Sequence, residues 1–383
     1  MHSFRPQHIP ALDGLRGIAI LLVIVHHQLI PLPLTGGFLG VDLFFVLSGF
    51  LITGLLLKEF SDTHSISLTR FYARRVLRLA PALVLYLCAT LIVTYLLHPE
   101  VFAKQLKLVG YAASYLANWR LALGWDYSLD ATAIIWSLSI EEQFYLLWPP
   151  VLIAVLYSRV KYQHVALALL LIIIGVAFHR SALWSSGVDL NRMYYGTDTR
   201  ADSLFAGCLI AFVSQLPLSA RLRAVLHIIA LCSLAVLVYL IATSTFNGTF
   251  LYRGGYTLVA LATALVIWSV ANAPDSWFAN VLAWSPLRWF GTISYGLYLW
   301  HWLLLRDISL YKWAGEWETA VRFALAIGIS AGSFYLIEAP FNSLKARFSY
   351  ARSRKRRQVS VDREPMVVPF ASSVIIQTSE QNT

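Results

Sequence analysis

The chain has 383 residues, of which 58% are hydrophobic and only 13% are charged, and its mean hydropathy is +0.64. A soluble domain needs more polar surface than this, so the composition indicates a polytopic membrane protein. The net charge of +10 alone would suit nucleic acid, but most basic residues flank expected membrane segments, and we expect no nucleic-acid partner. Cys88, Cys208 and Cys232 lie in apolar runs without paired spacing, which predicts neither a disulfide framework nor a metal site.

A helix needs about 20 mostly apolar residues to cross a bilayer core of about 30 Å. The sequence contains about ten such segments, which predicts an all-α, multi-pass protein of the cell membrane. We expect this to be the cytoplasmic membrane of a bacterium. The segments are 13–34, 38–57, 77–98, 133–156, 163–181, 200–217, 225–244, 254–272, 289–309 and 320–340.

About two thirds of the 30 Lys and Arg residues fall on one side if the amino terminus is inside, which predicts that both termini are cytoplasmic. We expect residues 1–342 to form the transmembrane domain. Residues 343–383 turn polar and basic ("KARFSYARSRKRRQ") and predict a largely disordered cytoplasmic tail. This tail either binds anionic membrane lipid or serves only as a topology anchor.

The first segment carries ionisable residues on one helical face. At about 100° per residue, Arg16 and His27 lie three turns plus about 20° apart, roughly 16 Å along the axis, with Asp13 close to the same face. His26 lies about 80° away from Arg16, which indicates a residue that packs beside the site or supports His27 from behind. Desolvating such groups is expensive, so they indicate function; a structural arginine and a histidine satisfied by a neighbouring helix are the alternative.

The fourth segment, "IIWSLSIEEQFYLLWPP", places Ser137, Glu141, Tyr145 and Trp148 on one face and points Glu142 elsewhere. A carboxylate inside a helix bundle can orient a histidine and stabilise its imidazolium. The alternative is a buried ion pair that holds helices together.

The stretch before the third segment, "TRFYARRVLRLAP", clusters Arg74, Arg75 and Arg78 beside two aromatic rings. Clustered arginines suit bidentate phosphate recognition, and a ring beside them can stack on a base. A nucleotide-bearing donor such as coenzyme A fits this pattern, although such clusters are also topology signals.

Three further stretches carry candidate cavity or acceptor-binding residues. The stretch "GVDLFFVLSGFLI" holds a carboxylate at the expected outer end of a span and a small polar residue in mid-span. The stretch "TDTRADS" gathers charged residues on the expected outer face. The stretch "ISYGLYLWHW" places a histidine among aromatic residues. The outer charges either bind a polar acceptor or pair with one another. The residues are Asp42, Ser48, Asp198, Arg200, Asp202, Tyr295, Tyr298 and His301.

Seven stretches in series resemble the acyltransferase 3 family of membrane-bound O-acyltransferases, over about residues 8 to 342. They are "LDGLRGIAILLVIVHH", "GVDLFFVLSGFLI", "FYARRVLRLAP", "WSLSIEEQFYLLWP", "TDTRADSLFAG", "ISYGLYLWHW" and "IEAPF". The resemblance implies a ten-helix domain that takes an acyl group from cytoplasmic acyl-CoA to a hydroxyl, usually on a carbohydrate. It assigns family positions to Arg16, His27, Arg74, Arg75, Arg78, Glu141 and Glu338.

The sequence departs from the family in two places. Many relatives carry an appended esterase-like domain where this chain has its basic tail, so we expect any later processing of the acyl group to need another protein. Leu303 follows "WHW", where the family often has proline.

These patterns lead to one mechanistic hypothesis. His27 acts as general base on the acceptor hydroxyl or transiently accepts the acyl group, Glu141 holds the imidazole, and Arg16 with the arginine cluster binds donor phosphates or polarises the thioester. We expect acetyl-CoA as co-substrate, no bound cofactor or metal, and a glycan-type acceptor. The alternative is a transporter or flippase that uses the same charges to move an acylated or acidic solute.

Overall fold

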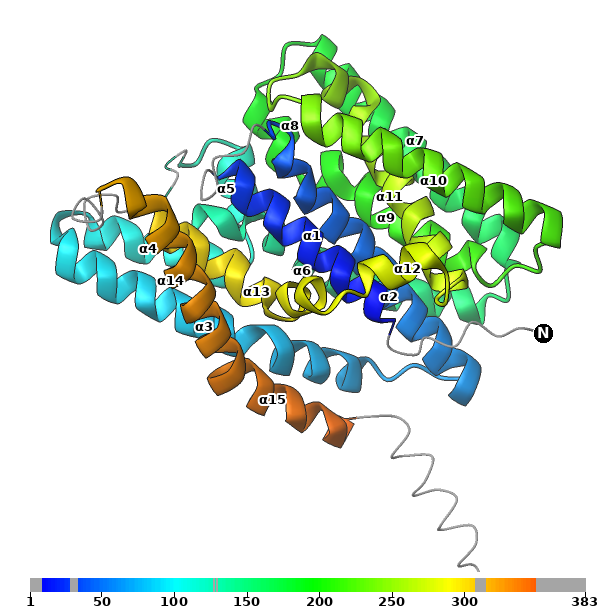
Figure 1. Cartoon of the computed structure of the whole chain (residues 1–383), viewed down its shortest axis with the longest axis horizontal. Coiled ribbons are helices and arrows are strands. Elements are labelled where there is room, and N and C mark those ends of the chain that lie inside the picture. The colour runs from blue at the N-terminus through cyan, green and yellow to red at the C-terminus, as the bar shows by residue number, and fades with distance from the viewer. Residues whose placement is uncertain (1–8, 28–33, 127, 129, 307–314, 349–383) are drawn as a thin grey trace, which may run out of the picture.

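The computed structural model describes residues 9–27, 34–126, 128, 130–306 and 315–348. All regular structure in these ranges is helical, which confirms the predicted all-α class (Figure 1). The α-helices are α1 Pro10–His26, α2 Gly40–Thr63, α3 Leu68–Leu97, α4 Phe102–Ala113, α5 Ala117–Ala122, α6 Trp136–Tyr157, α7 Tyr162–Ser185, α8 Leu190–Tyr195, α9 Thr197–Val213, α10 Ala220–Thr243, α11 Tyr256–Asn272, α12 Trp277–Leu282, α13 Ser285–Arg306, α14 Glu318–Ser333 and α15 Ala339–Ser343.

Within the described ranges, six helical segments are long and apolar enough to cross a membrane. They are Gly37–Thr63, Leu68–Leu97, Tyr162–Ser185, Ala220–Thr243, Leu251–Asn272 and Gly315–Ser343. The chain is thus a multi-pass membrane protein. Each of the ten predicted segments overlaps an α-helix, but α1 and α9 have only 17 residues each. The count of ten spans and the cytoplasmic termini therefore stay predictions.

The helices form an enclosed centre and an apolar periphery. The most apolar stretches of α2 and α11 are 83% and 72% buried inside the protein, whereas those of α7 and α10 are only 28% and 22% buried. Outward side chains such as Phe178, which is 75% exposed, suit contact with lipid tails. In Figure 1, α1 lies between α13 and α2, the helices that it contacts.

Glycines bring the central helices into backbone contact. A Cβ atom at Gly17 of α1 would overlap the carbonyl of Leu287 in α13, and one at Gly291 of α13 would overlap the carbonyl of Asp13. Small residues of this kind let membrane helices pack at short distance. The polar residues of α1 and α13 are thereby held close to each other.

The carboxyl-terminal segment folds back onto α3. A π-helical turn, Phe334–Glu338, leads through α15 into a 3-10 helix, Leu344–Phe348, whose last carbonyl accepts a 2.9 Å hydrogen bond from Arg74 Nη1. The first described residues of the predicted tail are therefore helical and attached to the bundle. The remainder of that tail, residues 349–383, lies outside the described residues.

Candidate active site

A cavity of about 650 Å³ lies between α1, α2, α3, α6, α13 and the carboxyl-terminal segment. We call it the larger cavity. Its charged lining residues are Asp13, Arg16, Arg75, Arg78, Glu141, Glu338 and Lys345. Four cationic groups thus face three carboxylates, and the excess positive charge in a partly enclosed space favours an anionic ligand.

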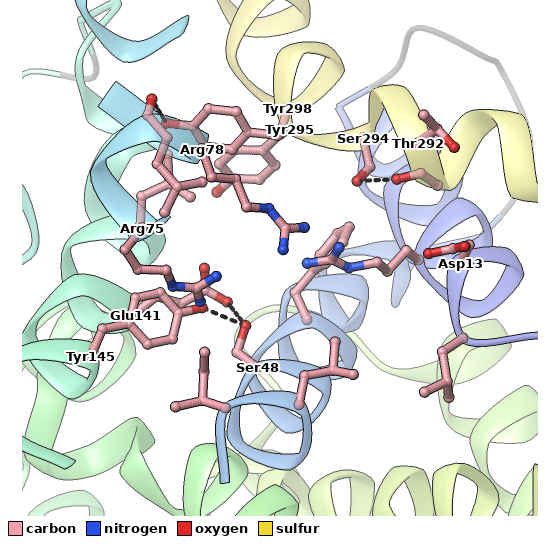
Figure 2. Close-up of a pocket in the computed structure, with 18 of the residues that line it drawn as sticks. Asp13, Ser48, Arg75, Arg78, Glu141, Tyr145, Thr292, Ser294, Tyr295 and Tyr298 are labelled. Carbon is pink, nitrogen blue, oxygen red and sulfur yellow. Dashed lines mark hydrogen bonds between the residues drawn. The ribbon is translucent and has the colours of Figure 1, made fainter. Parts of the chain in front are cut away.

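Glu141 is held in this cavity by a short chain of hydrogen bonds. Ser48 Oγ donates to Glu141 Oε1 at 2.6 Å, and the Tyr145 hydroxyl donates to Ser48 Oγ at 2.7 Å. The Arg75 guanidinium stacks on the Tyr145 ring at 3.7 Å from its centroid. Figure 2 shows Arg75 and Arg78 reaching from α3 toward this group. The α6 face predicted from sequence therefore meets the arginine cluster.

The three clustered arginines divide between two tasks. Arg75 and Arg78 line the cavity, whereas Arg74 pairs with Glu59 at 3.2 Å and bonds the Phe348 carbonyl. The buried Nε atoms of Arg16 and Arg75 have no hydrogen-bond partner among the described residues. Unused guanidinium donors beside a cavity are available to a ligand.

A second cavity, of about 180 Å³, lies at the carboxyl-terminal end of α1. We call it the smaller cavity. Aromatic rings make most of its wall, and both His26 and His27 line it. The aromatic lining residues are Phe38, Trp136, Tyr194, Tyr195, Phe246, Tyr298 and Trp302.

The hydrogen bonds of His27 define its protonation. His301 Nδ1 lies 2.8 Å from the Leu297 carbonyl, which can only accept, so Nδ1 carries the proton. In the neutral ring His301 Nε2 is then an acceptor, and it lies 3.0 Å from His27 Nδ1, which donates to it. This assignment leaves His27 Nε2 with a basic lone pair. The imidazole partner is thus His301, and not Glu141 as the sequence suggested.

A shared wall separates the cavities. Val41 and Tyr298 line both, and the Tyr298 hydroxyl lies 2.6 Å from Ser137 Oγ and 3.1 Å from the Ile134 carbonyl. Arg16 faces the larger cavity and His27 the smaller one, although both lie on one face of α1. The predicted stripe is thereby divided between two compartments.

The outer charged motif lies behind the aromatic wall and lines neither cavity. Arg200 donates to both oxygens of Asp42 at 2.9 Å, and its guanidinium lies 3.9 Å from the centroid of the Tyr256 ring and 5.0 Å from that of Tyr194. Asp202 accepts from Arg180 at 2.8 Å. We call these two ion pairs the paired cluster, and it supports Tyr194 from behind.

Asp198 and Tyr295, two other predicted residues, lie in different places. Asp198 pairs with Arg192 at 2.6 Å and with His179 at 3.0 Å, at a partly exposed position away from both cavities. Tyr295 lines the larger cavity and donates to the Leu79 carbonyl at 3.0 Å.

The described residues bring no three His, Cys, Asp or Glu side chains into a metal-binding group.

Several lining residues were missed by sequence reasoning, among them Lys345, Trp302 and Tyr194. Lys345 belongs to the basic run that resembles a topology signal, and Trp302 and Tyr194 belong to aromatic runs typical of a membrane interface. A signal existed for Trp302, because it follows His301 directly in "WHW". Trp302 Nε1 donates to the Asp130 carbonyl at 2.9 Å, which fixes the ring in the wall.

This combination of a helical membrane bundle, a cationic cavity and a histidine pair agrees with the family that the sequence matches. The family described as "Acyltransferase domain", of the acyltransferase 3 type, matches residues 9–338, and the chain belongs to it.

Among its relatives are the peptidoglycan O-acetyltransferase OatA of Listeria monocytogenes, 36% identical over 354 residues, and the O-acetyltransferase OatA of Staphylococcus aureus, 35% identical over 358 residues. The alignments cover 87% and 91% of this chain but only 56% and 57% of the relatives. The chain therefore spans little more than half the length of these proteins. No solved structure matches it.

Proposed function

We propose that the chain is a membrane O-acyltransferase that moves an acetyl group from acetyl-CoA to a hydroxyl group of a glycan. The observation that carries this proposal is the pair of cavities with a shared wall, one cationic and one lined by aromatic rings and an imidazole pair. The name of the Listeria relative makes peptidoglycan the first acceptor class to test.

The larger cavity suits the donor. Guanidinium groups bind phosphate oxygens through paired N–H donors, and Arg75 and Arg78 present such groups from α3. Arg16 lies on α1 in the same cavity and adds a third. Glu141 keeps Arg75 and Tyr145 in place, because its carboxylate bonds Ser48 in the chain described above.

The smaller cavity suits the acceptor hydroxyl. Aromatic faces give an apolar surface for the C–H face of a sugar ring, and His27 Nε2 offers the lone pair that accepts the hydroxyl proton. The oxygen then bonds the thioester carbonyl carbon, the C–S bond breaks, and the thiolate leaves and takes up a proton. Alternatively, Nε2 itself bonds the carbonyl carbon and carries the acyl group to the acceptor.

His301 is the positioning residue for this chemistry. It holds the His27 tautomer that places the lone pair on Nε2, and its own Nε2 accepts from the imidazolium that forms when His27 takes the proton. A neutral histidine thus does here what a carboxylate does in other acyl-transfer sites.

The two cavities define a direction of transfer. Arg16 and His27 are about 16 Å apart along α1, too far for both to contact one carbonyl group. Arg16 therefore binds the donor, and the acyl-bearing arm passes Tyr298 to reach His27. With ten spans and the basic loops in the cytoplasm, this path leads from the cytoplasmic side toward the outer side.

Release of free thiol from acetyl-CoA by the purified protein in nanodiscs tests the proposal, with muropeptides as acceptors. We expect release that depends on acceptor, is lost in His27→Ala and is retained, though reduced, in His26→Ala. If solute flux occurs with no thiol release from any acyl-CoA, the proposal is wrong and the transporter hypothesis replaces it.

A further inference from the structure

Lys345 brings a fourth cationic group to the larger cavity from outside every family motif. It lies on the 3-10 helix Leu344–Phe348, after the last apolar segment. The position of this helix is fixed, because Arg74 bonds the Phe348 carbonyl and pairs with Glu59. The amine is therefore held at the cavity by contacts that use one member of the arginine cluster.

The surroundings of Lys345 are strongly cationic. Arg16 from α1 and Arg75 and Arg78 from α3 repel its charge, and Glu338 from the π-helical turn attracts it. Arg74, the remaining cation nearby, is neutralised by Glu59. Lys345 forms no ion pair with another described residue, so Glu338 compensates this crowding only in part.

The crowding acts on the protonation of the amine. Burial first, and then the charges of the three arginines, lower the pKa of Lys345 to about 7. A lysine that only marks topology would remain in water with its full charge. The charged form of a half-buried lysine between guanidinium groups is stabilised when an anion lies among them.

We propose that Lys345 binds a phosphate group of the nucleotide part of the acyl donor, beside Arg75 and Arg78. This inference rests on the proposed function, because acetyl-CoA is the donor named there. The ammonium and the two guanidinium groups then surround the phosphates, while the acyl-bearing arm extends toward Tyr298. The crowded cations thereby gain the counter-charge that Glu338 supplies only in part.

The proposal predicts the direction in which donor affinity changes with pH. A bound phosphate raises the pKa of Lys345 above its value of about 7 in the free protein, so the complex binds protons more tightly than the free protein does. Donor affinity is then full where Lys345 is already protonated and falls as the pH rises from about 7 to about 9. In Lys345→Arg the charge persists throughout, and this part of the pH dependence disappears.

Equilibrium binding to the protein in nanodiscs tests the inference with two probes, free coenzyme A and pantetheine, which lacks the nucleotide and its phosphates. Lys345→Gln weakens coenzyme A binding about tenfold at pH about 7, and Lys345→Arg stays within about twofold of wild type. Pantetheine binding is unchanged in both. Lys161→Gln, at an exposed residue that lines neither cavity, is the matched control and leaves all affinities unchanged.

The outcomes separate this inference from the proposed function. If wild type binds coenzyme A and Lys345→Gln binds it equally well, the role of Lys345 is wrong and the function stands. If Lys345→Gln weakens both probes alike, the residue is structural and the inference is also wrong. If wild type does not bind coenzyme A at all, both the assignment of acetyl-CoA as the donor and the proposed role of Lys345 are wrong.

Discussion

Two groups of buried charges lie in this bundle, and they differ in whether the protein satisfies them. In the paired cluster, Asp42 has Arg200 and Asp202 has Arg180, with every one of these side chains fully buried. Around the larger cavity, four cationic groups face three carboxylates across about 650 Å³ of space. Buried charges with matched partners hold helices together, whereas an excess of one sign beside a cavity indicates a ligand.

The same comparison separates two kinds of tyrosine contact. Arg200 lies between the rings of Tyr194 and Tyr256 and belongs wholly to the interior. Arg75 lies on one face of Tyr145 and lines the cavity. The difference lies in access: Arg75 can turn its donors toward a ligand in the cavity, whereas Arg200, enclosed by two rings and a carboxylate, lines neither cavity.

The largest expected effect comes from removing the base, His27, which lines the smaller cavity and lies outside the paired cluster. His27→Gln keeps a polar side chain of similar size but has no imidazole lone pair, and we expect acetyl transfer to fall about 10²- to 10⁴-fold. The thermal unfolding temperature in nanodiscs should stay close to that of wild type. Transfer within threefold of wild type, measured as acetylated muropeptide, would contradict the base assigned here.

Breaking the paired cluster should act on stability. Asp42→Leu leaves Arg200 buried without its carboxylate, which costs about 3–5 kcal/mol in soluble proteins with buried ion pairs. The double variant Asp42→Leu/Arg200→Leu removes both charges and should recover part of that loss. Denaturant unfolding of the three proteins measures the difference. A single variant as stable as wild type would show that the pair does not hold the bundle.

The sequence could not distinguish these two groups of charges. The first segment and the "TDTRADS" motif both place acidic residues and arginine at helical spacing. However, the partner of Arg200 lies 158 residues away in the sequence, and the partner of His27 lies 274 residues away. Hydropathy predicted the helical class and where the ten helical segments lie. Side-chain partners depend on helix packing, and local periodicity contains no information about it.

The residues at which helices end also could not be predicted from the sequence. The first segment was predicted to continue to residue 34, whereas α1 ends at His26 and His27 caps it. His27 keeps the helical hydrogen bond from its backbone N–H to the Val23 carbonyl at 3.0 Å, so its imidazole stays on the side of α1 that packs on α13, where His301 lies. Residues 28–33 lie outside the described residues.

A smaller effect is expected from a substitution that disturbs only the contact between α1 and α13. Helix α1, which carries Asp13 and Arg16 into the larger cavity, packs on α13, and a Cβ atom at Gly17 would overlap the Leu287 carbonyl there. Gly17→Ala should lower stability by about 1–3 kcal/mol and reduce transfer, because the two helices must separate. Gly328→Ala in α14 is the matched control, since nothing lies within 4 Å of the added atom. Equal stabilities of the two variants would rule out close packing as the constraint.

The smallest expected effects come from one matched pair of serines. Ser48 bonds Glu141 at 2.6 Å beside the larger cavity, and Ser203 bonds Asp42 at 3.0 Å in the paired cluster. Substitution by alanine removes from each a hydrogen bond to a charged group, worth about 1.5–3 kcal/mol, and from Ser48 also the bond that it accepts from Tyr145. Ser48→Ala frees Glu141 to pair with the arginines, so we expect the KM for acetyl-CoA to rise with little change in unfolding temperature. Ser203→Ala should lower the unfolding temperature and leave KM unchanged. If both variants move the same quantity, the division between a ligand-binding group of charges and a structural one is wrong, because each variant removes a hydrogen bond to a buried carboxylate.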